Sequence, residues 1–214
     1  MRAERLRADP RIEVQVLVLA KAPVPGRVKT RLCPPLTPDG AARVAAAALE
    51  DTLDTVRAVA LARRVLVLDG SWDAAGFQIQ PQRGGPMPDR LAAAFDDCGD
   101  LPALLVGMDT PQLTPALLQQ AVDAFRRYDA VLGLAPDGGW WALGLRRPDG
   151  DLLRDIATSQ ADTGARQLDR LRDAGLDPYL LPELRDVDTA DDARAVAALA
   201  PAGRFAAVVR ELLP

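Results

Sequence analysis

Short apolar runs alternate with longer amphipathic segments along this chain, and turn-forming residues separate them. The run at residues 12–20 has a β-branched residue at four alternate positions, which is typical of a buried strand. A proline-containing connection follows, and Thr37 then begins an alanine-rich helix expected to extend to about residue 60. Residues 102–108 are almost entirely apolar, which indicates a central parallel strand covered on both faces.

The same patterns predict the remaining elements. Strands are expected at residues 64–69, 76–80, 130–135, 140–145 and 178–181, and helices at 89–98, 114–128, 162–174, from 189 and near 201. A hairpin is expected to join the strands at 130–135 and 140–145. This order predicts a Rossmann-like three-layer α/β/α sandwich with a mixed, mainly parallel sheet. We expect one domain over residues 1–214, with residues 1–10 frayed.

Composition narrows the possible chemistry. The 214 residues contain no histidine, which excludes Ser-His-Asp catalysis and histidine-ligated metals and leaves carboxylates and hydroxyls to hold a cation. Cys33 and Cys98 are too few for a disulfide framework or a zinc site, which favours the cytoplasm. The longest apolar runs are too short to span a membrane. A net charge of −4 argues against nucleic acid as a partner.

The connection after the first strand concentrates positive charge. The chain has two lysines, Lys21 and Lys29, and both share this connection with Arg27 and Arg31. Four cations within so few residues of an acidic chain suit a polyphosphate, and ligands of open α/β sheets bind at the carboxyl ends of strands. The glycine spacing of Walker and dinucleotide-binding loops is absent, so side chains would carry the binding. The alternative is a solvated basic loop.

Asp109 follows directly on the predicted central strand. A carboxylate in this position suits a hard divalent cation, because Mg²⁺ takes one or two protein carboxylates and completes its shell with phosphate and water. The alternative is that Asp109 caps the next helix, although Thr114 is better placed to do so.

The segment Asp137-Gly138-Gly139-Trp140-Trp141 predicts a hairpin turn, and it is also a candidate acceptor site. The two glycines would let a ligand approach the backbone, and an indole would stack on a sugar or a base. Alternation along a strand sends the two indoles to opposite faces, so at most one of them faces a ligand.

Acidic residues precede the last helices. Thr189 with Asp192 fits a capping box, which leaves Asp186 and Asp188 without a structural role. Either one is a candidate second metal ligand or acceptor contact. The Gly/Pro-rich loop at residues 82–91 would recognise a base or simply turn the chain, and the sequence favours neither.

Four motifs in order resemble the rSAM/selenodomain-associated transferases, a family of the GT-A-like nucleotide-diphospho-sugar transferase superfamily that is also similar to the guanylyltransferases of the deazaflavin cofactor pathway. The motifs are residues 20–32, 107–111, 137–145 and 186–189. The resemblance implies that Asp109 holds the divalent cation, Mg²⁺ or Mn²⁺, and that Lys29 with Arg27 and Arg31 grips phosphates.

Three positions depart from the family pattern. Thr110 stands where the family usually has Cys or Ser, and Trp140-Trp141 replace a pair of tyrosines. Met87-Pro88 replace a common Leu-Gly, which puts base recognition by the loop at residues 82–91 in question.

These features favour a metal-dependent, nucleotide-using transferase with Lys29 and Asp109 as catalytic residues. Transfer of phosphorus groups relies on positioning and charge neutralisation, which need no histidine. Four cations favour a nucleoside triphosphate, so we expect nucleotidyl transfer to a small phosphorylated or carboxylate acceptor with release of pyrophosphate. A glycosyltransferase with a nucleotide-diphospho-sugar donor is the first alternative, and a non-catalytic nucleotide-binding module is the second.

Overall fold

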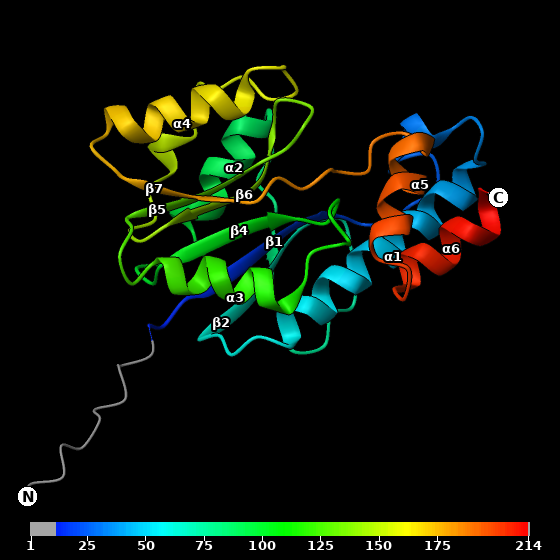
Figure 1. Ribbon diagram of the computed structural model, residues 1–214, viewed down its shortest axis with the longest axis horizontal. Coiled ribbons are helices and arrows are strands. Elements are labelled where there is room, and N and C mark those ends of the chain that lie inside the picture. Colours follow the sequence, from blue (N-terminus) through cyan, green and yellow to red (C-terminus); the bar gives the residue numbers. More distant parts are fainter. Residues whose placement is uncertain (1–11, 214) are drawn as a thin grey trace, which may run out of the picture.

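Seven strands form one sheet in the order β3-β2-β1-β4-β6-β5-β7 (Figure 1). The computed structural model describes residues 12–213, so the expected fraying of residues 1–10 lies outside the described residues. The strands are β1 (Gln15–Lys21), β2 (Arg63–Asp69), β3 (Gln78–Pro81), β4 (Ala103–Gly107), β5 (Ala130–Leu134), β6 (Trp140–Leu145) and β7 (Pro178–Leu181). Every strand runs in the same direction except β6, which is antiparallel to β4 and to β5. The predicted mixed, mainly parallel sheet is confirmed.

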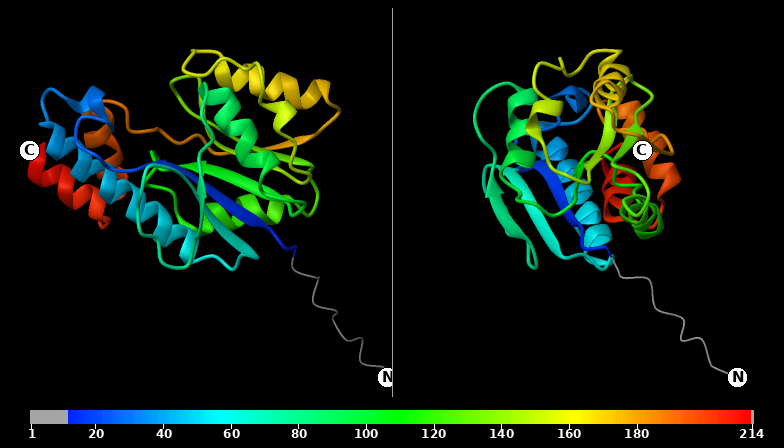
Figure 2. Two further views of the ribbon diagram at one scale, coloured as in Figure 1. Left: turned by 180° about the vertical axis from the view of Figure 1, so that it is seen from behind. Right: turned by 90° about the vertical axis from the view of Figure 1, so that its left-hand side faces the viewer.

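Helices cover both faces of the sheet, as the sequence predicts (Figure 2). One apolar cluster joins the sheet to α1 (Pro38–Arg57) and α3 (Pro115–Ala124). A second cluster, on the opposite face, joins it to α2 (Met87–Asp96) and α4 (Thr163–Asp173). β4 contributes buried residues to both clusters, which explains its almost continuous apolar sequence.

The last two helices extend the sandwich at one end. α5 (Ala190–Leu199) and α6 (Arg204–Leu212) pack on α1 in a third apolar cluster, which includes Val44, Val196 and Phe205 (Figure 1). The predicted capping box at the start of α5 is confirmed, because Thr189 and Asp192 exchange side-chain to backbone hydrogen bonds. The hydrophobic pattern predicts these helices but does not indicate which element they cover.

The segment between β7 and α5, residues 182–189, crosses the carboxyl edge of the sheet (Figure 1). The backbone N–H of Val187 donates to the carbonyl of Asp109 at 2.9 Å, and the indole N–H of Trp141 donates to the carbonyl of Pro182 at 3.1 Å. These bonds fix the segment across the ends of β4 and β6. It therefore brings Asp186 and Asp188 to the end of the central strand.

The predicted and observed bounds differ most at the end of α3. The helix expected at residues 114–128 ends at Ala124, after which the chain makes tight turns in which Arg126 donates to the carbonyl of Asp123 at 3.1 Å. Phe125 is fully buried at this end. Within residues 12–213, no helix is both long enough and apolar enough to cross a bilayer.

Candidate functional site

Two adjoining cavities open at the carboxyl edge of the sheet. Their volumes are about 340 and 370 Å³, which is within the range of small-molecule sites. The first, here called the cationic cavity, is lined by Lys21, Arg27, Lys29, Arg31, Asp69, Gln82, Arg90 and neighbouring residues. The second, here called the acidic cavity, is lined by Asp109, Asp137, Asp186, Asp188, Trp140, Thr110 and the segment at residues 158–163 except Asp162. Asp109, Asp188 and Arg31 line both cavities and therefore mark their boundary.

Lys29 lies at this boundary with two carboxylates. Its Nζ is 2.7 Å from Oδ1 of Asp109 and 3.8 Å from Oδ1 of Asp188, and it also donates to the carbonyl oxygen of Val187. The Lys29 side chain is only 7% exposed, whereas the two carboxylates are each about two-fifths exposed. Arg31 lies on the other side of Asp188, with its guanidinium 2.7 Å from Oδ2.

The local fold of the basic connection directs Lys29 inward. Val28 and Leu32 are buried, which anchors the connection on either side of the lysine. Lys29 itself has φ 48°, in the left-handed region, just before the short 3₁₀ helix η1 (Thr30–Leu32). A non-glycine residue in this region is strained by roughly 1 kcal/mol or more, and such strain is found preferentially at functional sites.

The other cations line the cationic cavity from different elements. Lys21 ends β1 and is exposed, as is Arg27 in the basic connection. Arg90 of α2 lies 3.3 Å from Asp69 at the end of β2. Arg90 and Asp69 were missed by sequence reasoning, because neither lies beside the lysine pair in the chain.

The loop at residues 82–91, whose role the sequence leaves open, lies on the same cavity. The amide of Gln82 donates to the carbonyl of Ala20 at 2.8 Å and to that of Val67 at 3.2 Å, so it ties the loop to β1 and β2. Met87 lines both cavities.

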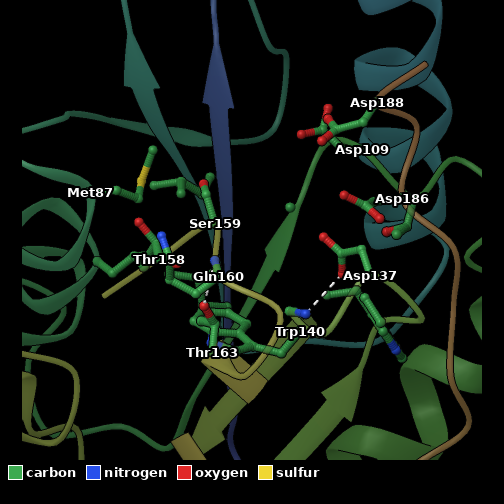
Figure 3. A pocket seen from close by; sticks show the side chains of 18 of the residues that line it. Met87, Asp109, Asp137, Trp140, Thr158, Ser159, Gln160, Thr163, Asp186 and Asp188 are labelled. Atoms are coloured by element: carbon green, nitrogen blue, oxygen red, sulfur yellow. Dashed lines mark hydrogen bonds between the residues drawn. The ribbon is translucent and has the colours of Figure 1, made fainter. Parts of the chain in front are cut away.

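Four carboxylates gather around the acidic cavity (Figure 3). Asp188 lies beside Asp109, whereas Asp186 lies beside Asp137 (Figure 3). Burial, together with the negative charges of Asp137 and Asp188, raises the pKa of Asp186 to about 6. Asp137 also shapes the hairpin, because its Oδ1 accepts a hydrogen bond from the backbone N–H of Gly139 at 2.8 Å.

The structure separates the residues of the predicted acceptor motif. Trp140 and Gly139 line the acidic cavity, but Gly138 does not. A Cβ atom on Gly138 would lie 2.0 Å from the carbonyl oxygen of Ala161, and its φ is +90°. Its close approach is therefore to the protein's own backbone rather than to a ligand.

The two indoles have different surroundings, as strand alternation predicts. Trp141 is buried against Gly133, where an added Cβ would lie 2.4 Å from the indole ring. Trp140 is half-buried, packs beside the cluster on the other face of the sheet, and lines the acidic cavity (Figure 3). Trp141 also lines this cavity but is only 4% exposed, so Trp140 is the indole more available to a ligand.

Two features of the acidic cavity were missed from the sequence. Thr158, Ser159, Gln160 and Thr163 line it from the loop before α4 and from the first residue of that helix. The hydroxyl of Thr110 is buried without a hydrogen-bond partner. A polar run before a helix was visible in the sequence, but it is equally typical of an ordinary helix start.

The donor set at the boundary fits a divalent cation. Asp109 and Asp188 present hard oxygen ligands from two different segments, and the ammonium of Lys29 shows that their position accepts a positive charge. Within residues 12–213, no three or more acidic or cysteine side chains are grouped as a metal-binding set. Any cation held here would therefore take its remaining ligands from a substrate or from water, as Mg²⁺ commonly does.

A protein-family comparison identifies the chain. Residues 42–160, more than half of the sequence, match the profile of the family described as "Uncharacterized protein conserved in bacteria (DUF2064)". The chain belongs to the DUF2064 family. The match begins after the basic connection and ends before the segment that carries Asp186 and Asp188. A search of curated proteins gave no match.

Solved structures share the fold of this DUF2064 protein. A protein from Desulfovibrio desulfuricans G20, provisionally described as a nucleotide-diphospho-sugar transferase, is 27% identical, with a TM-score of 0.78 over 94% of this chain and 98% of the other. Rv0371c from Mycobacterium tuberculosis H37Rv is 21% identical, with a TM-score of 0.60 over 88% and 99%, and a second structure of it contains manganese.

A more distant structure, CMP:2-keto-3-deoxy-manno-octonic acid synthetase complexed with CTP, is 14% identical, with a TM-score of 0.58 over 88% and 98%. The fold is therefore that of the GT-A-like nucleotide-using transferases.

Proposed function

We propose that this protein is a divalent-cation-dependent transferase that moves a nucleotidyl group from a nucleoside triphosphate to a small acceptor and releases pyrophosphate. The observation that carries the proposal is the position of the Lys29–Asp109–Asp188 cluster between a cationic and an acidic cavity. This arrangement suits a reaction between a polyanionic donor and a second substrate, because such a reaction depends on positioning and on stabilising negative charge.

Two of the comparisons support this proposal. The synthetase with the same fold binds CTP, and Rv0371c binds manganese. The likeness to the rSAM/selenodomain-associated transferases, noted in the sequence, supports a nucleotide-using transferase, but that family label favours glycosyl over nucleotidyl transfer.

The cation would be held by Asp109 and Asp188. These two carboxylates would hold it beside the cationic cavity, where its positive charge would help to neutralise the charge of the leaving pyrophosphate. Asp186 lies with Asp137, away from this pair, so its predicted role as a metal ligand is the weaker of the two assignments (Figure 3).

The cationic cavity would bind the triphosphate. Lys21, Arg27 and Arg90 line it, together with Lys29 and Arg31. Charged hydrogen bonds of this kind are worth roughly 1.5–3 kcal/mol each, so several of them suffice for micromolar binding of a polyphosphate.

The transfer step needs little covalent chemistry from the protein. An acceptor oxygen in the acidic cavity forms a bond to the α-phosphorus, the bond from the α-phosphorus to the bridging oxygen breaks, and pyrophosphate leaves toward the cations. Lys29 is placed to stabilise the charge that develops on the leaving pyrophosphate, because its ammonium pairs with Asp109 and the residue also lines the cationic cavity.

Glycosyl transfer is the second candidate. It is favoured by the Desulfovibrio protein, which is described as a nucleotide-diphospho-sugar transferase and matches almost the whole of this chain. In that reaction the same residues would hold the diphosphate of a nucleotide sugar.

A two-stage experiment tests the proposal. The full-length protein is first screened by thermal shift against nucleoside triphosphates and nucleotide sugars with Mg²⁺ or Mn²⁺, since a ligand that binds only the native state raises the melting temperature. The products formed from each hit are then measured. Pyrophosphate release from a triphosphate supports nucleotidyl transfer, and nucleoside diphosphate release from a nucleotide sugar supports glycosyl transfer. Binding of a nucleotide without turnover in the presence of any acceptor would identify a binding module instead.

A further inference from the structure

We infer that the acceptor of this transferase is an uncharged polyhydroxylated molecule, such as a sugar or polyol without phosphate or carboxylate groups. This inference rests on the proposed function, and it differs from the phosphorylated or carboxylate acceptor that the sequence predicts. It is carried by the charges and hydrogen-bonding groups that line the acidic cavity.

The charge of the cavity opposes an anionic acceptor. Asp109, Asp137, Asp186 and Asp188 all line it, and Arg31 is the one cation among the described residues that line it. The Arg31 guanidinium is already paired with Asp188 at 2.7 Å, and its side chain is 69% exposed. Asp109 and Asp188 are balanced by Lys29 and by the proposed cation, but a phosphate in the cavity would also face Asp137 and Asp186, which repel it.

The cavity instead offers acceptors for hydroxyl hydrogens. Carboxylate oxygens accept hydrogen bonds strongly, and the cavity carries Asp137 and Asp186 at a distance from the proposed cation ligands (Figure 3). A hydroxyl that attacks phosphorus must also lose its proton, and the Asp137 carboxylate lines the space in which it would bind. A phosphate or carboxylate acceptor attacks through an ionised oxygen, so it needs neither a group that accepts a hydrogen bond from it nor a group that takes up its proton.

Thr110 gives an independent indication of a ligand. It is 2% exposed and lines the acidic cavity, yet its hydroxyl has no hydrogen-bond partner. Buried polar groups in native proteins are almost always paired, so this hydroxyl is suited to a ligand group that both donates and accepts. A sugar hydroxyl does both.

Trp140 supplies an apolar wall. It is half-buried, and the hydroxyl-bearing residues Thr158 and Ser159 line the same cavity (Figure 3). An indole face next to polar groups suits a ring that has an apolar face and polar edges, as sugars and cyclic polyols do. The whole cavity, at about 370 Å³, has room for a molecule of that size.

Matched pairs of ligands test the inference. Binding of glucose, myo-inositol and glycerol to the full-length protein with Mg²⁺ is measured by saturation-transfer NMR, next to glucose 1-phosphate, inositol 1-phosphate and glycerol 3-phosphate. We expect at least one neutral compound to bind about tenfold or more tightly than its phosphorylated partner. Trp140→Ala should weaken that binding about tenfold while nucleotide affinity stays unchanged, which also shows that the variant is folded.

Charge removal gives a second readout. The double variant Asp137→Asn with Asp186→Asn should narrow or reverse the preference for the neutral compound, whereas the control Asp169→Asn, exposed on α4, should not. The inference is overturned if each phosphorylated compound binds as well as its neutral partner, or if no neutral compound binds. A separate titration with nucleoside triphosphates keeps the two claims distinct: absence of nucleotide binding refutes the proposed function, whereas nucleotide binding with a preference for phosphorylated acceptors refutes only this inference.

Discussion

The ammonium of Lys29 lies 2.7 Å from Oδ1 of Asp109, at the point where the cationic and acidic cavities meet. A single side chain thus pairs with a proposed metal ligand while remaining at the edge of the proposed phosphate site. Binding of a divalent cation and of a nucleotide must both change the surroundings of this ammonium. Their binding is therefore expected to be coupled through Lys29.

Lys29→Met should change cation binding and nucleotide binding in opposite directions. Removing the ammonium leaves Asp109 without its paired cation and Asp188 with Arg31 alone, so the affinity of the free protein for Mn²⁺ should rise. Nucleotide affinity in the presence of Mn²⁺ should fall by about tenfold to a hundredfold, because one charged hydrogen bond is lost. Titrations of Mn²⁺ by electron paramagnetic resonance and of nucleotide by calorimetry measure these changes. Unchanged nucleotide affinity would leave Lys29 with a structural role alone.

Asp109→Asn tests the cation site by removing the charge of a proposed ligand. The substitution keeps the shape of the side chain but removes its charge, so Mn²⁺ affinity should fall by about tenfold or more and turnover should be lost. The melting temperature should stay close to that of the wild type. Asp169→Asn, exposed on α4, is the matched control and should change neither property. Full turnover by the Asp109 variant in Mg²⁺ would refute the assignment.

Much of this arrangement follows from the sequence. The apolar run before Asp109 predicts a central strand, and the placement of the two lysines predicts a basic connection at the carboxyl end of the first strand. Alternation predicts that Trp140 and Trp141 have opposite environments. These features depend on residues that are close together in the chain, where periodicity and turn chemistry act directly.

The remainder depends on tertiary packing. Arg90 reaches the cationic cavity because α2 begins beside the end of β2, and Asp188 reaches Asp109 because residues 182–189 cross the sheet edge. Nothing local to Gly138 indicates that Ala161 will pack against it. The sequence therefore predicts a ligand contact where the structure shows a contact within the protein.

Gly138→Ala should destabilise the fold strongly. The added methyl group would clash with the Ala161 carbonyl, and the alanine would also have to adopt a positive φ. In Gly76→Ala the alanine must adopt a φ of +83°, but its methyl group would have no atom within 4 Å. We expect the Gly76 variant to lose about 1–2 kcal/mol of unfolding free energy and the Gly138 variant clearly more. Urea denaturation measures both values. Equal losses would show that the contact with Ala161 carries no cost.

The two cysteines should differ in reactivity. Burial raises the pKa of Cys98 to about 12, so this thiol stays protonated through the neutral range, whereas Cys33 is only half-buried. The thiolate is the reactive form, so a disulfide reagent at pH 8 should label Cys33 first and Cys98 only after unfolding. Counting labelled thiols before and after addition of denaturant measures this. Rapid labelling of both thiols in the native protein would contradict the burial of Cys98.

The measurement that tests the central claim most directly is a calorimetric titration of the full-length protein with each nucleoside triphosphate, with Mn²⁺ and then with a chelator in its place. The proposed site predicts saturable binding of at least one triphosphate with Mn²⁺, and binding at least about tenfold weaker without it, because Asp109 and Asp188 alone would repel the phosphates. If no triphosphate binds in the presence of Mn²⁺, or if binding is equally tight with the chelator, the site is not a cation-dependent nucleotide site.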